Sequence, residues 1–536
     1  MDKYFYAPTN AYGAGASDQR CLSPLMTKQA VKRRMVQVKG RFILVIALWF
    51  SVFWTVGVST ERPNFIIVLA DDLGYGDLGC YGRKEAHTPN LDRFAKEGLR
   101  LTHCYAANAN CSPSRTGLMT GRTPTRVGVS NWIPMLSPMH VSDKEITIAK
   151  LLQEGGYDTA HVGKWHLNGR FNLPGQPQPN DHGFKHWFST QNNALPNHRN
   201  PYNFVRNGIP TGPIKGFSAQ IVTDEAIRWL RAQRDKKKPF FLFVCYHEPH
   251  EPIATNPKFA KLHPSDDPSY SAYCGNVTQM DVAFGRLMAE VDQLKLSDNL
   301  FTLFTSDNGP ARTSFHPHGE TGSLREKKGW LYEGGIRVPG ILRWPENTRQ
   351  GSTSDIPVSG IDLLPTLCEV AGIPEPTDRA IDGTSFLPLL EGKPILRKTP
   401  LYWHFYATSG KPKVAMRMGE WKILAHLDAP EISMRVDLTE LDQKTLKTAK
   451  LGRLELYNLR ADPGETRDLA VSETSRLKKM SRRLQEIYAG VQKDCPTWPE
   501  WQWARYEHER IQWPPYRGKR KVELRIPKIP PPTNVK

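Results

Sequence analysis

The sequence predicts an α/β fold, with a mainly parallel sheet covered by helices and a smaller antiparallel domain after it. Apolar runs of strand length alternate with helical segments between residues 60 and 400, and several of these runs are apolar throughout. Strands that are apolar on both faces are typical of a parallel sheet buried between two layers of helices. After residue 400 shorter strands replace them. The chain of 536 residues, 39% of them hydrophobic, is long enough to bury such a core.

The first 59 residues are predicted to be a leader that precedes the fold. Residues 1–41 carry eight Lys or Arg and two Asp, and residues 42–58 (FILVIALWFSVFWTVGV) are uncharged and apolar. The small residues Gly57 and Ser59 lie where a signal peptidase would cleave, so this is a basic n-region and signal peptide. The alternative is an uncleaved membrane anchor, because the apolar run nearly spans a bilayer. Both alternatives predict an exported protein, periplasmic or extracellular, that contacts a membrane only if the leader is kept.

The net charge of +18 falls to +12 without the leader. A basic body suits an anionic partner such as an acidic polysaccharide or an anionic lipid, although a merely soluble basic surface has the same composition. The charges are scattered and no nucleic-acid-binding motif is present, so we expect no nucleic acid partner. The 14 Trp residues fit carbohydrate handling without proving it.

The eight cysteines do not form a disulfide framework or a zinc site. They are far apart in a long chain, and no CxxC pair occurs. Cys111 is treated separately below. The others outside the leader are expected to form one or two bridges or to stay buried: Cys80, Cys104, Cys245, Cys274, Cys368 and Cys495.

The first predicted strand, residues 64–70 (NFIIVLA), is apolar and β-branched and ends in Asp71-Asp72. Two later strands also end in polar residues, one in Lys164-Trp165-His166 and one in Asp307-Asn308. Open α/β sheets carry their sites at these strand ends. In chain order, the other expected elements are a helix at 88–98, a helix at 146–154, a strand at 157–163, a basic amphipathic helix at 218–235, a strand at 240–246, a helix at 271–294 and a strand at 299–306.

The pattern changes near residue 400. Short antiparallel strands are predicted at 401–406, 414–418 and 421–426, and residues 455–470 lead into a helix that ends near Tyr488. From Trp498 the chain is rich in Trp, Pro and Arg and is expected to be extended or partly disordered. The predicted organisation is a leader at 1–59, an α/β domain at 60–400, a small antiparallel sheet with a helix at 401–490, and a tail at 491–536.

Two of the polar strand ends suggest a metal site. Asp71-Asp72 could cap a helix or form a surface pair, and Asp307-Asn308-Gly309-Pro310 could be a simple turn. Two oxygen-rich strand ends in one sheet favour metal binding instead. Carboxylate and amide oxygens without soft donors select Ca²⁺ or Mg²⁺ over zinc.

The most informative stretch is Cys111-Ser112-Pro113-Ser114-Arg115, followed by TGLMTGR. A Cys four residues before an Arg could be purely structural. However, C-x-P-x-R closely resembles the maturation signal of the formylglycine-dependent (type I) sulfatases of the alkaline phosphatase superfamily. Five further motifs agree in order and spacing between about Pro63 and Ala470: DDLGYGD, GKWH, HEPH, SDNGP and YEGGIRVP. Among sulfatases, the pattern looks most like the arylsulfatase A and N-acetylgalactosamine-6-sulfatase group.

The resemblance implies that Cys111 is oxidised to 3-oxoalanine (formylglycine) by a formylglycine-generating or anaerobic sulfatase-maturing enzyme. In this family one hydroxyl of the aldehyde hydrate attacks sulfur and displaces the alcohol. The second hydroxyl then loses its proton, which expels sulfate and restores the aldehyde, an exit that a plain Ser or Cys lacks. One Ca²⁺ per chain would lower the pKa of the hydrate. Its implied ligands are Asp71, Asp72, Asp307, Asn308 and the modified Cys111.

The resemblance also assigns the remaining catalytic roles. Arg115 would hold the hydrate, and Lys164 and Lys328 would bind sulfate oxygens where charge builds in the transition state. His166 would accept the proton of the hydrate, and His250 would bind the substrate and protonate the leaving oxygen. Outside this context each of them would be an ordinary packed or surface residue. Three neighbours stay open: Lys327 as an alternative to Lys328, and His247 and His318 as residues that shape the substrate pocket.

The implied activity is hydrolysis of a sulfate ester of a sulfated carbohydrate or an aryl sulfate. The implied fold is alkaline phosphatase-like, with a large mixed, mainly parallel sheet between helices and a four-stranded antiparallel sheet after residue 400. Two alternatives stay open, a phosphonate monoester or phosphodiester hydrolase of the same superfamily and a non-catalytic protein that binds sulfated glycans. Specificity is expected to depend on residues 196–216 and 498–517. The sequon Asn276-Val277-Thr278 would matter only in a host that glycosylates proteins.

Overall fold

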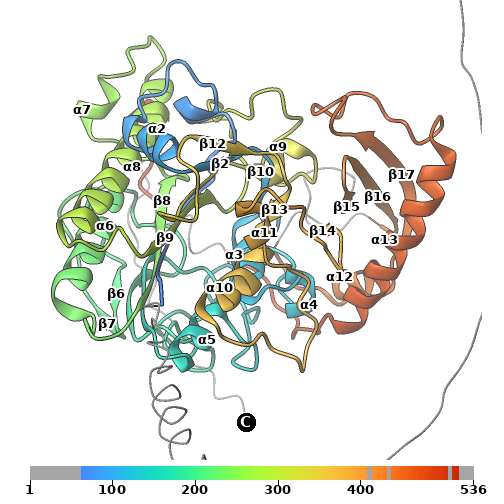
Figure 1. Ribbon diagram of the computed structural model, residues 1–536, viewed down its shortest axis with the longest axis horizontal. Coiled ribbons are helices and arrows are strands. Elements are labelled where there is room, and N and C mark those ends of the chain that lie inside the picture. Colours follow the sequence, from blue (N-terminus) through green and yellow to red (C-terminus); the bar gives the residue numbers. More distant parts are fainter. Residues whose placement is uncertain (1–61, 407–412, 431–435, 505–509, 518–536) are drawn as a thin grey trace, which may run out of the picture. The chain divides into compact units, whose positions relative to one another are not determined.

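The structure, a computed structural model, describes residues 62–406, 413–430, 436–504 and 510–517. The predicted leader therefore lies outside the described residues. In the described part of the chain, a ten-stranded mixed sheet has the order β12-β2-β11-β9-β1-β8-β4-β5-β6-β7 (Figure 1). Its strands are β1 (Asn64–Asp71), β2 (Leu99–Leu101), β4 (Asp158–Lys164), β5 (His186–Thr190), β6 (Val205–Arg206), β7 (Ile209–Pro210), β8 (Phe240–Pro249), β9 (Leu300–Ser306), β11 (Gly340–Arg343) and β12 (Ser352–Ser354).

The middle of this sheet is parallel. Strand β1 lies between β8 and β9, and Ile67 pairs in register with Phe243 on one side and Leu303 on the other. Strands β4 and β5 continue the parallel block beyond β8, whereas β11 runs antiparallel to β9. The mainly parallel, mixed sheet predicted from the sequence is confirmed.

Helices cover both faces of the sheet (Figure 1). Alternate residues of β1 point to opposite faces, so Ile66 and Val68 belong to one apolar cluster and Phe65 and Ile67 to the other. The first cluster includes α2 (Pro89–Glu97), α6 (Ser218–Arg228) and α8 (Pro268–Gln293); the second includes α3 (Cys111–Thr120), α5 (Ile148–Glu154) and α10 (Leu363–Ala371). Each fully buried large aliphatic or aromatic side chain in these layers contributes about 1.5–3 kcal/mol.

The C-terminal part forms the predicted four-stranded antiparallel sheet. Its order is β14-β15-β16-β17, and α13 packs against one face. The fourth strand was not located from the sequence, nor was the short sheet β10-β3-β13 that lies between the two larger sheets. The elements are β14 (Leu401–His404), β15 (Val414–Met418), β16 (Trp421–Asp428), α12 (Glu440–Thr448), β17 (Lys450–Asn458), α13 (Thr474–Asp494), β3 (Cys104–Tyr105), β10 (Arg337–Val338) and β13 (Val358–Ser359).

Several expectations change in detail. Helix α6 gives way at Trp229 to a π-helical turn, Trp229–Gln233, that buries Trp229 and Leu230. The seven cysteines in the described ranges are all free thiols, and most of them are buried, so no bridge forms among them. Asn276 is buried inside α8 and donates to the carbonyl of Ala254, which makes the sequon inaccessible to glycosylation in the folded protein.

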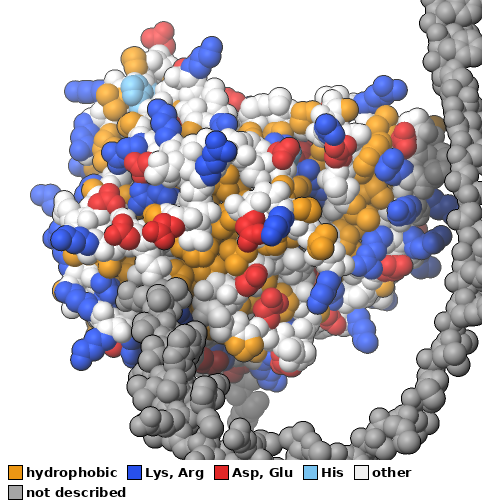
Figure 2. Space-filling model, viewed as in Figure 1, with side chains coloured by type: hydrophobic (Ala, Val, Ile, Leu, Met, Phe, Trp, Pro, Cys, Tyr) orange, Lys and Arg blue, Asp and Glu red, His pale blue; other side chains and the backbone are white. Residues whose placement is uncertain are grey.

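Two observations concern partners. None of the helices in the described part of the chain combines the length and the apolar character that crossing a membrane requires. On the face drawn in Figure 2, Lys and Arg side chains are spread out and mixed with Asp and Glu. This face therefore carries no continuous basic patch of the kind that binds nucleic acid.

Candidate active site

Four neighbouring parallel strands bring the predicted site residues together. Strands β9, β1, β8 and β4 are adjacent in the sheet, so their carboxyl ends meet at one edge. Asp71 and Asp72 follow from β1, His250 from β8 and Lys164 from β4, while Asp307 and Asn308 follow β9. The sheet order thus collects residues that lie more than 230 positions apart in the sequence.

Cys111 occupies the first position of α3, whose N-terminus points toward this edge. The side chain of Asn110 caps the helix by accepting a hydrogen bond from the Cys111 amide at 2.9 Å. The residue is 2% exposed. Burial raises the pKa of the Cys111 thiol to about 11, although Lys164 and Lys328 act in the opposite direction. At neutral pH the side chain is therefore a neutral thiol rather than a ready thiolate nucleophile.

The carboxylates at the strand ends are each paired with a buried cation. Lys164 donates to Oδ2 of Asp71 at 2.6 Å, and Arg115 donates through Nη2 and Nε to Oδ2 of Asp307 at 2.8 and 3.0 Å. Burial alone would raise the pKa of Asp71, but Lys164 and His250 lower it. Burial and the neighbouring charge of Asp71 raise the pKa of Asp307. The cluster can therefore accept additional positive charge.

The side chains of the adjacent residues Lys327 and Lys328 lie in different places. The ammonium of Lys328 lies 2.6 Å from Oδ1 of Asp72 and faces the cavity, whereas that of Lys327 donates to the carbonyl of Arg312 at 2.8 Å. Lys328 is therefore the lysine that can contact a ligand beside Cys111, as the motif spacing suggested.

Three buried oxygens in this cluster have no hydrogen-bond partner. They are Oδ1 of Asp71, Oδ2 of Asp72 and Oδ1 of Asn308. Unpaired buried oxygens are costly unless a cation or water satisfies them. In addition, ligand atoms of Asp71, Asp72, Cys111 and His250 all lie within 4.8 Å of one another. The oxygen-rich donor set fits a hard divalent cation such as Ca²⁺.

The two histidines at this edge are buried or nearly so. Nε2 of His166 lies 3.1 Å from the carbonyl of Ile133, and its Nδ1 has no partner. Nε2 of His250 lies 3.6 Å from Oδ2 of Asp72. Burial lowers the pKa of both rings. Asp72 and His166 also have left-handed backbones, with φ of 64° and 59°, a strain that often marks functional positions.

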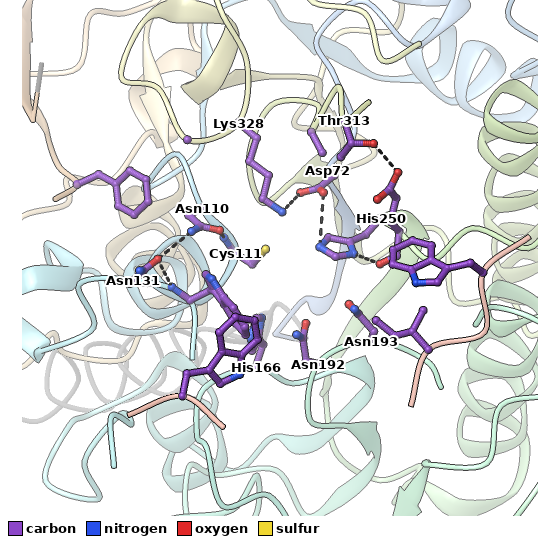
Figure 3. A pocket seen from close by; sticks show the side chains of 18 residues that line it. Asp72, Asn110, Cys111, Asn131, His166, Asn192, Asn193, His250, Thr313 and Lys328 are labelled. Atoms are coloured by element: carbon purple, nitrogen blue, oxygen red, sulfur yellow. Dashed lines mark hydrogen bonds and ion pairs between the residues drawn. The ribbon is translucent and has the colours of Figure 1, made fainter. Parts of the chain in front are cut away.

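The residues surround a cavity of about 400 Å³ (Figure 3). Asp72, Cys111, His166, His250 and Lys328 line it, and their side chains point into it. The other predicted site residues are buried behind this surface and hold it in place: Asp71, Arg115, Lys164, Asp307 and Asn308.

Two residues that the sequence left open, His247 and His318, do not line the cavity. His247 does not line the cavity, because its ring turns into the core, where Nε2 lies 2.8 Å from the hydroxyl of Thr190. His318 lies away from the cavity, where Ser269 and Asp267 contact its Nε2. Both were suggested by nearness in sequence to site residues, which does not fix the direction of a side chain.

Sequence reasoning missed a set of polar residues that line the cavity. They are Asn110, Asn131, Asn192, Asn193, Glu251 and Thr313, several of which are labelled in Figure 3. Asn192 and Asn193 follow β5, so the rule that located the other site residues at strand ends would have found them had β5 been recognised. Asn131 carries no such signal, because it lies in a loop and reaches the cavity through a hydrogen bond from Asn110 at 3.2 Å.

Aromatic residues complete the lining. They are Trp132, Phe405, Trp503 and Trp513, together with the aliphatic Ile511. Trp503, Ile511 and Trp513 belong to the Trp-rich tail. The described part of the tail therefore lines the pocket, which agrees with the expectation that residues 498–517 lie near the substrate. The loop 196–216 does not line the cavity, although Pro196 and Asn197 hydrogen-bond to Gln512 of the tail.

Comparison with known proteins gives a consistent result. A family model described as Sulfatase matches residues 63–373, and one described as N-sulphoglucosamine sulphohydrolase, C-terminal, matches residues 319–493. Human arylsulfatase A is 32% identical over 486 residues, covering 85% of this chain and 93% of that protein. N-acetylgalactosamine-6-sulfatase from Canis lupus familiaris is 33% identical over 392 residues, covering 68% and 72%. The solved structure of Ps i-CgsB in complex with k-i-k-neocarrahexaose aligns with a TM-score of 0.70 and 27% identity, covering 84% of this chain and 96% of that one.

Proposed function

The chain belongs to the sulfatase family, and from this premise we propose that it hydrolyses sulfate esters of a carbohydrate with a nucleophile made from Cys111. One observation carries the proposal. Cys111 begins a helix at the floor of a cavity, within 4.8 Å of two carboxylates and a histidine and beside the ammonium of Lys328. A neutral, buried thiol is a poor nucleophile, which supports conversion of Cys111 to formylglycine before catalysis.

The donor set supports a bound Ca²⁺. Asp71, Asp72, Asp307 and Asn308 would hold it, because three of their oxygens are buried without partners. When bound, the ion supplies Lewis acidity and screens the charge of the incoming sulfate. Arg115 orients Asp307 through two hydrogen bonds, and Lys164 orients Asp71 through one.

The cavity residues divide the remaining work. Cys111, once oxidised, would carry the aldehyde hydrate, whose two hydroxyls would supply the nucleophile for sulfur and the proton whose loss lets sulfate leave. Lys328 neutralises sulfate oxygens as their charge grows, with Lys164 adding positive charge from behind the surface. His250 faces the cavity as the group that protonates the leaving oxygen, and His166 accepts the proton of the hydrate. Both rings have lowered pKa values, so both are neutral near pH 7, and His250 must gain its proton before it can act as an acid.

The substrate class follows from the relatives and the charge. Relatives include an N-acetylgalactosamine-6-sulfatase and an arylsulfatase, and one similar structure holds a neocarrahexaose. The net charge of +12 without residues 1–59 also favours a polyanionic substrate. We therefore propose a sulfated glycan as the natural substrate and aryl sulfates as smaller test substrates.

Maturation and export belong to the same proposal. A formylglycine-generating or anaerobic sulfatase-maturing enzyme would exchange the sulfur and two hydrogens of the Cys111 side chain for one oxygen. The basic segment at 1–41 and the apolar run at 42–58 would direct the chain out of the cytoplasm. Sequencing the N-terminus of the native protein would show whether the leader is removed.

The test is release of inorganic sulfate from p-nitrophenyl sulfate and from a panel of sulfated oligosaccharides in the presence of Ca²⁺. The protein would be co-produced with a formylglycine-generating enzyme, with Cys111→Ala as the control and a mass spectrum of the Cys111 peptide. We expect release by the matured protein and none by the control. Matured protein that leaves every sulfate ester intact but cleaves bis(p-nitrophenyl) phosphate would contradict the proposal in favour of a phosphodiesterase. Glycan binding without turnover of any ester would instead favour a non-catalytic binding protein.

A further inference from the structure

The described residues after α13 form one wall of the active-site cavity. We call residues 496–504 and 510–517 the C-terminal segment. Trp503, Ile511 and Trp513 of this segment line the same cavity as Cys111 and Lys328, and the red trace of the segment passes two sides of the cavity in Figure 3. The segment lies beyond residue 493, where the family models stop matching the chain.

The first half of the segment is fixed to the body of the protein. Trp501 forms two backbone hydrogen bonds with Leu438, of 2.8 and 3.1 Å. The indole N–H of Trp498 donates to the carbonyl of Gly128 at 2.8 Å, and the amide of Trp503 donates to Oδ1 of Asp437 at 2.7 Å. Together these hydrogen bonds hold the backbone of Trp503 in one position.

The second half is fixed to different loops. The amide of Gln512 donates to the carbonyl of Pro196 at 2.9 Å, and its own carbonyl accepts from Asn197. The hydroxyl of Tyr516 lies 2.7 Å from Nε2 of His316. The ring of Trp513 stacks on Phe315 with centroids 5.8 Å apart. The two halves are thus attached independently, and the wall is preorganised rather than assembled by a ligand.

The lining of this wall has the chemistry of a sugar-binding surface. Trp503 packs edge-to-face on Trp132, with centroids 5.4 Å apart, and both rings are partly exposed. Aromatic faces attract the C–H faces of sugar rings, since the face of an aromatic ring is negative and those hydrogens are weakly positive. Asn110 and Asn131 are bonded to each other, but Asn192 and Asn193 also line the cavity, and Oδ1 of Asn192 is buried without a hydrogen-bond partner. These two amides supply donors and acceptors for sugar hydroxyl groups, which a simple aryl sulfate lacks.

We propose that the C-terminal segment is a glycan-binding wall that selects sulfated oligosaccharides over small sulfate esters. The inference rests on the proposed function, because the cationic floor at Lys328 must hold the sulfate group of the same ligand. With the sulfate at the floor, the sugar rings attached to it stack against Trp503 and Trp513, and the asparagines bind their hydroxyls. The two tryptophans are specificity-determining residues and take no part in the chemical step.

The experiment compares two kinds of substrate on the matured enzyme with Ca²⁺. The variants are Trp503→Ala and Trp513→Ala, with Trp503→Phe and Trp513→Phe as conservative partners and Gln502→Ala, an exposed neighbour in the same segment, as the control. The substrates are p-nitrophenyl sulfate and tetrasaccharides of chondroitin 6-sulfate and of carrageenan. For the tetrasaccharide that the wild type cleaves, we expect each Ala variant to raise KM about tenfold with kcat nearly unchanged, because the lost contacts are made before and during the reaction alike. The Phe variants should lie in between, and the fold loss of kcat/KM on p-nitrophenyl sulfate should be several times smaller than on the tetrasaccharide, because this substrate has no sugar rings to stack on the wall.

Each outcome decides one of the two proposals. An equal loss on both substrates, or no loss on the tetrasaccharide, would overturn the glycan-binding wall. So would turnover of p-nitrophenyl sulfate with no tetrasaccharide either cleaved or bound. If the matured wild type cleaves no sulfate ester at all, the proposed function fails. The wall can then be tested alone by titrating the Cys111→Ala variant with the same tetrasaccharides and following tryptophan fluorescence. The glycan-binding wall predicts that this variant binds a tetrasaccharide and that adding Trp503→Ala weakens the binding.

Discussion

At the scale of single residues, Lys327 and Lys328 are neighbours with the same side chain in different surroundings. The ammonium of Lys328 contacts Asp72 at the cavity surface, whereas that of Lys327 is bound to a backbone carbonyl. Removing a charge that stabilises a developing anion lowers kcat by about 10²–10³. We therefore expect Lys328→Ala to lose about this much kcat/KM on p-nitrophenyl sulfate while Lys327→Ala stays within about threefold of the wild type. A larger loss in Lys327→Ala than in Lys328→Ala would show that the motif spacing identified the wrong lysine.

The unpaired oxygens of Asp71, Asp72 and Asn308 give a second prediction at this scale. A cation held by these oxygens binds the folded protein and not the unfolded chain. Ca²⁺ at about 100 times its dissociation constant should therefore raise the free energy of unfolding by about 2.7 kcal/mol. We expect EDTA to lower both the melting temperature and the activity, and excess Ca²⁺ to restore both. Asp307→Asn should weaken this response, because the Asp307 carboxylate is one of the proposed ligands.

Glu225→Gln, a substitution on α6 that leaves every proposed ligand intact, is the control for this measurement. Its melting temperature should still respond to Ca²⁺ as strongly as that of the wild type. If the wild type shows the same melting temperature with EDTA and with Ca²⁺, the cation site is not real.

Much of the site was predictable from the sequence, because several of the recognised motifs lie at the carboxyl ends of predicted strands. Asp71 and Asp72, Lys164, and Asp307 and Asn308 each follow an apolar strand, and the motifs add Cys111 and His250. Asn131 and Trp132 were not predictable, because a loop places them and no local pattern marks a loop residue as facing a cavity. For His247 the motif left the role open, and the structure shows that its side chain turns inward to Thr190.

At the scale of the elements, the long apolar strands were found and the short ones were missed. Strands β1, β4, β8 and β9 have seven to ten residues, and nearly all of these residues are buried. By contrast, β3, β10 and β13 have two residues each, too few for any periodicity, and they exist because they pair with one another. Tertiary pairing rather than local sequence determines such elements.

Helix α6 is tied to β5 and β6 by one carboxylate, which allows a prediction of pH dependence. Burial alone would raise the pKa of Glu225, but hydrogen bonds from His186, Arg206 and Arg228 outweigh it and lower the pKa to about 2. A carboxylate whose pKa is lower in the folded state stabilises the protein above its unfolded pKa of about 4.5, and this contribution is lost as the pH falls toward 2.

Glu225→Gln should therefore lower the free energy of unfolding by about 2 kcal/mol at pH 7. The difference from the wild type should hold down to about pH 5 and then shrink, as measured by urea unfolding between pH 7 and pH 3.5. Asp224→Asn, an exposed neighbour that pairs with Arg286, is the matched control and should change stability by less than about 0.5 kcal/mol at every pH. A difference that grows as the pH falls would contradict this assignment of the pKa.

At the scale of the whole molecule, a buried ion network joins the four-stranded sheet to the catalytic α/β region. Lys422 of β16 is fully buried, and its ammonium lies 2.9 Å from both Glu333, at the start of α9 (Glu333–Ile336), and Glu465, which follows β17. Burial raises the pKa of Glu465; burial alone would also raise that of Glu333, but Lys422 and nearby arginines lower it.

The network predicts a large effect of one substitution. Lys422→Met leaves two carboxylates buried without their shared cation, which should lower the free energy of unfolding by about 3–5 kcal/mol at pH 7.5. Because Lys422 lowers the pKa of both carboxylates, removing it raises both, and the pKa of Glu465 then lies further above its unfolded value. The penalty is complete above the folded-state pKa of Glu465 and is relieved as the pH falls toward 4.5. Urea unfolding at pH 7.5 and pH 5.5 should therefore show a smaller difference from the wild type at the lower pH.

Adding Glu465→Gln to Lys422→Met separates the charge effect from simple loss of packing. The double variant removes one of the two stranded charges, and the remaining Glu333 still has Arg337 at 3.6 Å and the hydroxyl of Tyr105 at 2.6 Å. It should thus be more stable than Lys422→Met alone, even though it differs from the wild type at two positions. If the double variant is less stable than the single one, the contribution of Lys422 is its packed aliphatic stem rather than its charge.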